Sequence, residues 1–141
     1  MPTYPDPRFF SVLIAEDNPV NMTLNKIIIR NMFPNVRIVE AENGEIAVDL
    51  SEKERFDIIL MDIMMPVMNG YEATLMIRQR EMNQHTPLIA LTASIMPDEM
   101  HKCLKVGFND SLSKPIIRDD LYLIIDKWLT KNDIQIQIDP L

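Results

Sequence analysis

Three acidic residues follow short apolar runs that have the composition of buried strands. Glu16 and Asp17 end one such run, and Asp62 ends another. The second run leads into Pro66 and the pair Asn69-Gly70, which favours a strand that enters a loop. In open parallel α/β sheets, ligands bind at the carboxyl ends of the strands. We therefore expect the three acids to lie at one edge of a sheet.

Three neighbouring carboxylates favour the binding of a divalent cation. Two unit charges ~5 Å apart repel by roughly 3 kcal/mol at an effective dielectric constant of about 20, so the group needs a counter-ion or a proton. The donors are hard oxygens with no His or Cys beside them, which favours Mg²⁺. The dedicated ligand loop typical of calcium sites is absent.

Two further polar residues stand at the ends of later segments of strand type. Thr92 and Lys114 offer a hydroxyl and an ammonium group to the same expected edge, and these groups are ligands of a phosphoryl group. An Asp carboxylate beside a metal ion is able to attack phosphorus and form an aspartyl phosphate. The joint placement of the five residues therefore predicts phosphoryl transfer.

Five segments of strand type alternate with five segments of helix type. The strands are predicted at residues 11–15, 36–41, 58–61, 88–91 and 110–113. The helices are predicted to begin at Asn18-Pro19 and Asn43-Gly44, to span residues 70–82, to run from Pro97 to Gly107 with Met100, Cys103 and Leu104 facing inward, and to run from Ile117 to Leu129. The alternation requires right-handed crossovers and a parallel sheet covered on both faces. We therefore predict an α/β fold, a doubly wound (βα)5 flavodoxin-like three-layer sandwich with strand order 2-1-3-4-5.

The two ends of the chain fall outside this alternation. Residues 1–10 contain three prolines and are predicted to be an N-terminal lead-in or linker, residues 11–129 the domain, and residues 130–141 a C-terminal tail. In the tail, isoleucines at 134, 136 and 138 alternate with glutamines at the period of a strand. An edge segment, the start of a linker and disorder all remain open for it.

Composition argues against several classes of function. A formal net charge of −7 over 141 residues argues against nucleic-acid binding by this chain, because such binding relies on clustered Lys and Arg. No apolar run approaches the ~20 residues of a membrane span, and the N-terminus lacks the apolar core of a secretory signal. We therefore expect a cytoplasmic chain without membrane insertion, with a place in the cytoplasmic part of a membrane-bound sensor kinase left open. The single cysteine, Cys103, excludes an internal disulfide.

Taken together, the motifs resemble the receiver (response-regulator) domain of two-component signalling, over residues 11–129. Glu16-Asp17 matches the acidic pair of that family, Asp62 its phosphorylated position, Thr92-Ala93 its switch hydroxyl, and Lys114-Pro115 its lysine and proline.

The resemblance also implies roles for these residues. It implies that Asp17, Asp62 and the Met64 carbonyl bind Mg²⁺ directly and that Glu16 acts mainly through water. It implies that Thr92, Ala93 and Lys114 bind the phosphoryl group and that the Lys114–Pro115 bond is cis.

The amino-acid sequences at residues 16–21, 87–93 and 109–116 are similar to those of receiver modules fused to hybrid sensor histidine kinases. This implies a phosphorelay in which Asp62 takes a phosphoryl group from a phosphohistidine and the domain changes conformation. The implied partners are the phosphohistidine domain of a histidine kinase, a histidine phosphotransfer protein, or both. Self-phosphorylation, self-dephosphorylation and a dimer through the fourth helix, fifth strand and fifth helix are also implied.

Four other functions stand as alternatives to the receiver function. The first is a stand-alone, single-domain response regulator. The second is a small Mg²⁺-dependent aspartyl-phosphate phosphatase, but such enzymes generally need a second Asp two residues after the nucleophile, where this chain has Met64. The third is a flavin-binding protein of the same fold, but this chain lacks the Ser/Thr-rich phosphate loop that such a protein would have after the first strand. The fourth is a metal-free interaction module with a decayed site, which the presence of all five residues of the expected site argues against.

One position departs from the receiver pattern. Receivers usually carry Tyr or Phe three residues before the lysine, and this chain has Ser111 there. We therefore expect phosphorylation to move Thr92 and the loop up to Pro97, with only a weak change at Ser111.

Overall fold

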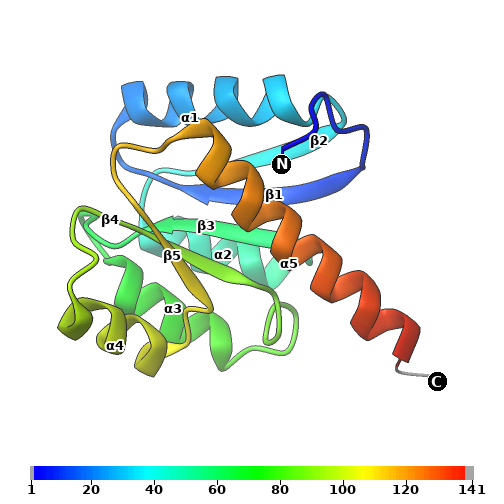
Figure 1. Cartoon of the computed structure of the whole chain (residues 1–141). Coiled ribbons are helices and arrows are strands. Elements are labelled where there is room, and N and C mark those ends of the chain that lie inside the picture. The colour runs from blue at the N-terminus through cyan, green and yellow to red at the C-terminus, as the bar shows by residue number, and fades with distance from the viewer. Residues whose placement is uncertain (1, 139–141) are drawn as a thin grey trace.

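The computed structural model describes the backbone of residues 2–138 and the side chains of residues 2–132. Its parallel sheet has the strand order β2-β1-β3-β4-β5 (Figure 1). In chain order the elements are β1 (Phe10–Ala15), α1 (Pro19–Met32), β2 (Val36–Ala41), α2 (Gly44–Lys53), β3 (Ile58–Asp62), α3 (Gly70–Arg78), β4 (Leu88–Thr92), α4 (Pro97–Val106), β5 (Asp110–Ser113) and α5 (Arg118–Ile138). The predicted fold class and strand order are confirmed.

The sheet separates two apolar cores, one on each face. Along β1, Val12 and Ile14 face the core that α1 and α5 cover, whereas Leu13 and Ala15 face the core that α2, α3 and α4 cover. All five residues of β3 and all five of β4 are buried. Strands covered on both faces are continuously apolar, which is why these runs lack polar alternation.

Asparagine side chains cap the first turns of α1, α2 and α3. The Asn18 side chain accepts hydrogen bonds from the backbone N–H groups of Val20 and Asn21, and Pro19 occupies the first turn of α1. Asn69 and Glu72 form a reciprocal capping box at the start of α3. The cap at Asn18 holds the preceding acids at the end of β1.

Three helices differ in detail from the sequence-based prediction. The spacing that predicts α1 is that of Val20, Leu24, Ile27 and Ile28. The first three are exposed, whereas Ile28 is partly buried against the core that Met22, Ile29 and Met32 face. Leu104 is 61% exposed, so its predicted inward orientation is wrong; only Cys103 of α4 is fully buried, since the helix packs on the sheet through a narrow face. Helix α3 ends at Arg78, before the predicted residue 82, because the Arg78 guanidinium binds carbonyls of the loop that follows.

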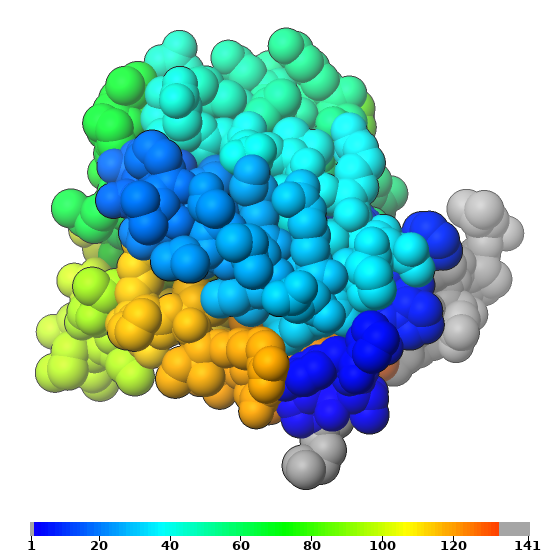
Figure 2. Space-filling model, turned by 90° about the horizontal axis from the view of Figure 1, so that it is seen from above, coloured from blue at the N-terminus to red at the C-terminus, as the bar shows by residue number. Residues whose placement is uncertain are grey.

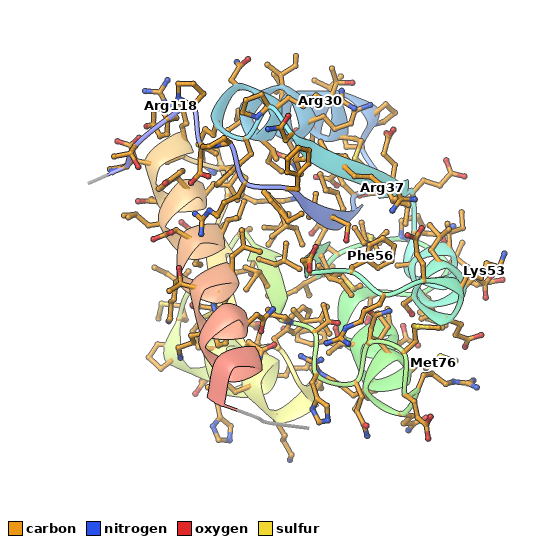
Figure 3. The ribbon with its side chains drawn as sticks, turned by 90° about the vertical axis from the view of Figure 1, so that its right-hand side faces the viewer. Arg30, Arg37, Lys53, Phe56, Met76 and Arg118 are labelled. Atoms are coloured by element: carbon orange, nitrogen blue, oxygen red, sulfur yellow. The ribbon has the colours of Figure 1, made fainter. Side chains whose placement is uncertain are left out.

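The N-terminal segment is packed against the domain. Buried Asp6 accepts a hydrogen bond from the Tyr122 hydroxyl of α5 at 2.9 Å, and its backbone N–H donates to the Met32 carbonyl at the end of α1 at 2.7 Å. The Arg118 guanidinium lies over the Tyr4 ring, and Figure 3 shows Arg118 beside this segment. Residues 4–8 therefore connect α1 to α5.

Helix α5 continues into the predicted tail. Its backbone is helical through Ile138, so the alternating isoleucines do not form a strand, and residues 139–141 lie outside the described residues. Extending an existing helix fixes one residue per added hydrogen bond, whereas a new strand needs a partner edge. Within the described part of the chain, no helix combines the length and apolar character needed to cross a bilayer.

Candidate functional site

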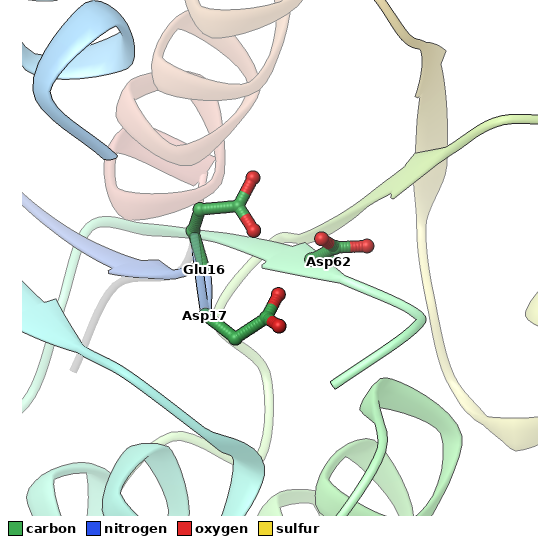
Figure 4. A group of neighbouring side chains, drawn as sticks. All are labelled: Glu16, Asp17 and Asp62. Carbon is green, nitrogen blue, oxygen red and sulfur yellow. The ribbon is translucent and has the colours of Figure 1, made fainter. Parts of the chain in front are cut away.

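The three predicted acids converge at the carboxyl edge of the sheet (Figure 4). Strands β1 and β3 pair in parallel with Ala15 opposite Met61, so the next residues along each strand, Glu16 and Asp62, are neighbours. One carboxylate oxygen from each of Glu16, Asp17 and Asp62 lies within 4.8 Å of the others. Glu16 and Asp62 are buried and Asp17 is exposed, so the cluster opens to solvent on the Asp17 side.

Lys114 reaches the same cluster from the end of β5. Its Nζ lies 2.6 Å from Asp62 Oδ2 and 3.2 Å from Glu16 Oε1. The Lys114 backbone N–H donates to the Thr92 carbonyl at 2.8 Å, and the predicted cis bond to Pro115 is present. The other Asp62 oxygen, Oδ1, accepts from the Met64 backbone N–H at 3.1 Å. Both oxygens of Asp62 are therefore held in place.

The charges in this cluster do not balance. Three carboxylates face one ammonium group, which leaves an excess of negative charge when all are ionised. Burial and the neighbouring Asp62 carboxylate raise the pKa of Glu16, and Lys114 only partly offsets them. Burial alone would lower the pKa of Lys114, but its contacts with Asp62 and Glu16 raise it overall. The arrangement therefore favours an added cation.

The Thr92 hydroxyl is bound within its own loop. Oγ1 donates to the Ser94 carbonyl at 3.0 Å and accepts from the Ser94 backbone N–H at 3.1 Å. Ser111 stands where receivers usually carry Tyr or Phe. Its hydroxyl donates a hydrogen bond to the sulfur of Met100 on α4 at 2.9 Å. Ser111 thus links β5 to α4 by a side-chain contact.

All seven predicted site residues line one cavity of about 260 Å³. Its lining consists of Glu16, Asp17, Asn18, Asn21, Asp62, Ile63, Met64, Leu91, Thr92, Ala93 and Lys114. The sequence-based prediction did not include the two asparagines as site residues. Asn21 follows the Asn18 cap by three residues, so helical spacing alone places both on the side of α1 that faces the acids.

The residues present fit a magnesium ion. The donors around the cavity are carboxylate and carbonyl oxygens, which Mg²⁺ prefers, and no His or Cys lines it. Two oxygens on opposite sides of a Mg²⁺ lie about 4.2 Å apart, close to the spread of the acidic cluster. The open side at Asp17 leaves room for the waters that Mg²⁺ retains.

Comparisons with known proteins agree with this site. A family model of the response regulator receiver domain matches residues 12–126. Sensor protein GacS of Pseudomonas syringae pv. syringae is 39% identical over 120 residues, which are 83% of this chain and 13% of that protein. The chain therefore spans a small part of that relative's length.

Two solved structures extend the comparison. The receiver domain of sensor histidine kinase PA1611 from Pseudomonas aeruginosa PAO1, which has a magnesium ion coordinated in its active site cleft, is 38% identical, with a TM-score of 0.80 over 87% of this chain and 99% of that one. A chain from the complex of the Saccharomyces cerevisiae histidine phosphotransfer signaling protein Ypd1 with the receiver domain of the response regulator Ssk1 is 30% identical, with a TM-score of 0.79 over 87% of this chain and 90% of that one. With a family model that matches most of its length, this chain belongs to the response regulator receiver domain family.

Proposed function

We propose that Asp62 accepts a phosphoryl group with the help of Mg²⁺. The observation that carries the proposal is the ion pair between Asp62 and Lys114, at 2.6 Å, inside a cluster with two further carboxylates. Asp17, Asp62 and the Met64 carbonyl would hold the ion directly, and Glu16 through water. When bound, Mg²⁺ neutralises the carboxylates and withdraws charge from the phosphoryl oxygens.

In the proposed reaction, an Asp62 oxygen attacks phosphorus as the phosphorus–nitrogen bond of a phosphohistidine breaks. The electron pair of that bond stays on the imidazole nitrogen, and the product is an aspartyl phosphate. Lys114 keeps its ammonium group beside the transferred oxygens and balances their charge. Hydrolysis reverses the state: water attacks phosphorus, the bond to Asp62 breaks, and inorganic phosphate takes the proton.

Thr92 would couple the modification to the fold. Its hydroxyl now donates to the Ser94 carbonyl, so binding a phosphoryl oxygen requires that bond to break. The residues up to Pro97 would then move, which changes the surface of α4 and β5. Ala93, exposed beside Thr92, would offer its backbone N–H to the same group.

Acetyl phosphate with Mg²⁺, followed by intact mass measurement, tests the proposal. We expect a gain of one phosphoryl group in the wild-type chain and none in Asp62→Asn. Asp57→Asn, which changes an Asp at the opposite edge of the sheet, is the matched control and should keep the gain. An unmodified wild-type chain would refute the proposal, and multiple turnover of small phosphate esters would favour the phosphatase alternative.

We further propose that the phosphoryl donor or acceptor is a phosphohistidine protein and that the parent is a hybrid sensor histidine kinase. The exposed apolar side chains Val20, Leu24 and Ile27 follow one face of α1, whose first turn lines the cavity. Figure 2 looks onto the side of the molecule that α1 covers. A helical partner could bury this stripe while its histidine approaches Asp62.

Other parts of the sequence-based prediction stay proposals. These are the domain bounds at residues 11 and 129, a cytoplasmic location, and a dimer through α4, β5 and α5. Size-exclusion chromatography with light scattering, before and after addition of beryllofluoride, tests the dimer: a mass that stays monomeric in both states would count against it.

A further inference from the structure

The first turns of α1 and α3 differ at the third helical position. In α3, Asn69 is the cap, and the Glu72 side chain at the third position accepts from the Asn69 backbone N–H at 3.2 Å. In α1, Asn18 is the cap and Asn21 is the third residue, but the Asn18 N–H donates to the Glu16 carboxylate at 3.4 Å instead. The Asn21 side chain therefore takes no part in capping its helix.

Asn21 lines the cavity that holds Asp62. It is half-buried there, and within residues 2–132 its side-chain amide has no hydrogen-bond partner. The neighbouring Asn18 Oδ1 accepts from the backbone N–H groups of Val20 at 2.9 Å and of Asn21 at 3.1 Å, which occupies both of its lone pairs. Of the two asparagines beside the acids, only Asn21 thus keeps a neutral oxygen acceptor for use in the cavity.

Hydrolysis of an aspartyl phosphate at Asp62 requires such an acceptor. The attacking water must lie in line with the breaking bond, on the side of phosphorus opposite the Asp62 oxygen. Because Asp62 is buried, that side is the one toward solvent. The water presents a lone pair to phosphorus, so its hydrogens point away and need acceptors. A side-chain oxygen at the mouth of the cavity would therefore hold the water in the reactive orientation.

The other side chains around the cavity are poorly suited to this task. The three carboxylates face Lys114 and the proposed ion. The Thr92 hydroxyl is bonded to the backbone of Ser94, and in the proposed function it binds the phosphoryl group. The apolar side chains of the lining have no acceptor, and the Met64 thioether is a weak one. The amide of Asn21 is the acceptor that remains among the described side chains of the lining.

We propose that Asn21 is a positioning residue for hydrolysis of the aspartyl phosphate, with its amide oxygen accepting a hydrogen bond from the attacking water. Side-chain amides orient the attacking water in other phosphoryl-transfer sites. As the bond from water oxygen to phosphorus forms, the bond from phosphorus to Asp62 breaks and its electron pair returns to the carboxylate. The proton of the water passes to the departing phosphate, and Asn21 neither gains nor loses one. This inference rests on the proposed function.

The lifetime of the phosphorylated chain tests the inference. The chain is phosphorylated with acetyl phosphate, desalted into saturating Mg²⁺ and followed by intact mass measurement. Asn21→Leu has nearly the same size but no acceptor, so we expect its lifetime to lengthen about fivefold, as for the loss of one hydrogen bond. Asn21→Asp keeps an acceptor oxygen and loses the amide donor, so its lifetime should be no longer than that of wild type.

Two further variants control the experiment. Thr23→Leu exchanges another polar side chain of α1, one that is exposed and does not line the cavity, and should keep the wild-type lifetime. Asn21→Ala removes the acceptor without adding an apolar side chain, so it should lengthen the lifetime as Asn21→Leu does, and it replaces that variant if leucine prevents folding. Circular dichroism confirms that each variant is folded.

The outcomes discriminate between the two proposals. A wild-type lifetime in folded Asn21→Leu or Asn21→Ala would overturn the role of Asn21 in hydrolysis. A lifetime in Asn21→Asp as long as that in Asn21→Leu would overturn it too, because an acceptor at this position would then be without effect. A wild-type chain that acetyl phosphate does not modify would instead refute the phosphoacceptor function itself.

Discussion

Two half-buried cations, Lys114 and Arg78, occupy opposite edges of the sheet, and their partners differ in kind. Lys114, at the carboxyl edge, contacts the carboxylates of Asp62 and Glu16. Arg78, at the amino edge, has no carboxylate within ion-pair distance among the described side chains. Its six hydrogen bonds go to the backbone carbonyls of Asn83, Gln84, Thr86 and Gly107 and to the side chain of Asn109.

This difference suggests that Arg78 stabilises the fold, whereas Lys114 belongs to a site with capacity to react. Carbonyl acceptors carry no net charge, so burial lowers the pKa of Arg78, and its hydrogen bonds close the loops before β4 and β5. Around Lys114 the acceptors carry excess negative charge beside an open cavity, and its pKa is raised. All acceptors around Arg78 at the amino edge are therefore uncharged, whereas the carboxyl edge keeps excess negative charge beside the cavity, which fits the proposed cation and phosphoryl group.

The largest expected effect concerns activity at the carboxyl edge. In Lys114→Met, phosphorylation by acetyl phosphate should slow about 10³-fold, because a preorganised donor to the transferred oxygens is lost. Time-resolved intact mass measurement gives the rate. Lys127→Met removes a different lysine, paired with Asp110 at 3.1 Å, and should leave the rate unchanged. Equal phosphorylation rates in wild type and Lys114→Met would refute the proposed role of Lys114 in binding the transferred oxygens.

The next effect concerns stability at the amino edge. Arg78→Met leaves several loop carbonyls without a donor, so the free energy of unfolding should fall by about 3 kcal/mol. Urea denaturation measures this, and phosphorylation per folded molecule should stay at the wild-type level. Arg37→Met removes an exposed arginine paired with Glu54 and should have a much smaller effect. A large loss of activity in folded Arg78→Met would break the proposed separation.

The two edges also differ in how far the sequence predicts them. The acids, Thr92 and Lys114 each stand at the end of a predicted strand, so a parallel sheet brings them together without further information. The Arg78 partners are mostly main-chain carbonyls, which every residue has, and nothing in the side-chain pattern marks them. Likewise Val67, in the loop between β3 and α3, has a φ of 68°. A β-branched residue disfavours positive φ, so no propensity predicts this conformation.

Sequence patterns also misplace residues where only one face of an element is covered. Val20, Leu24 and Ile27 have helical spacing and correctly indicate a helix, but they lie outside the core. Which face of α1 is buried depends on the elements that pack against it, and the periodicity of apolar residues alone does not identify those elements. In the N-terminal segment, three prolines indicate an extended chain, but the contacts of Asp6 depend on tertiary packing.

Asp6 is a second polar group that, like Arg78, is expected to stabilise the fold, and its contribution should depend on pH. Burial opposes ionisation, but hydrogen bonds from Arg8 and Tyr122 outweigh it and hold the pKa below its ordinary value of 3.8. Its contribution to stability is therefore complete above that value and disappears as the pH falls through the lower, folded-state pKa. Asp6→Asn should lose about 2 kcal/mol at neutral pH and show a flatter decline of stability in acid, measured by urea denaturation at several pH values. Arg8 also forms an ion pair with Asp126. If the loss of stability in acid were the same in Asp6→Asn as in wild type, a group other than Asp6 would be responsible for it.

The smallest expected effect on stability has the opposite sign. Asp62→Asn removes one charge from a crowded carboxylate cluster while Lys114 retains Glu16, so without metal the free energy of unfolding should rise by about 1 kcal/mol. Wild type should gain about 1.4 kcal/mol when Mg²⁺ reaches ten times its dissociation constant, because a ligand of the native state stabilises it. The variant should gain much less. Urea denaturation in chelator and in Mg²⁺ compares the two.

A variant that is less stable than wild type without metal would mean that Asp62 belongs with Arg78 among the groups that maintain the fold. An increase would mean that this edge gives up stability so that its charges remain available for the ion and the phosphoryl group.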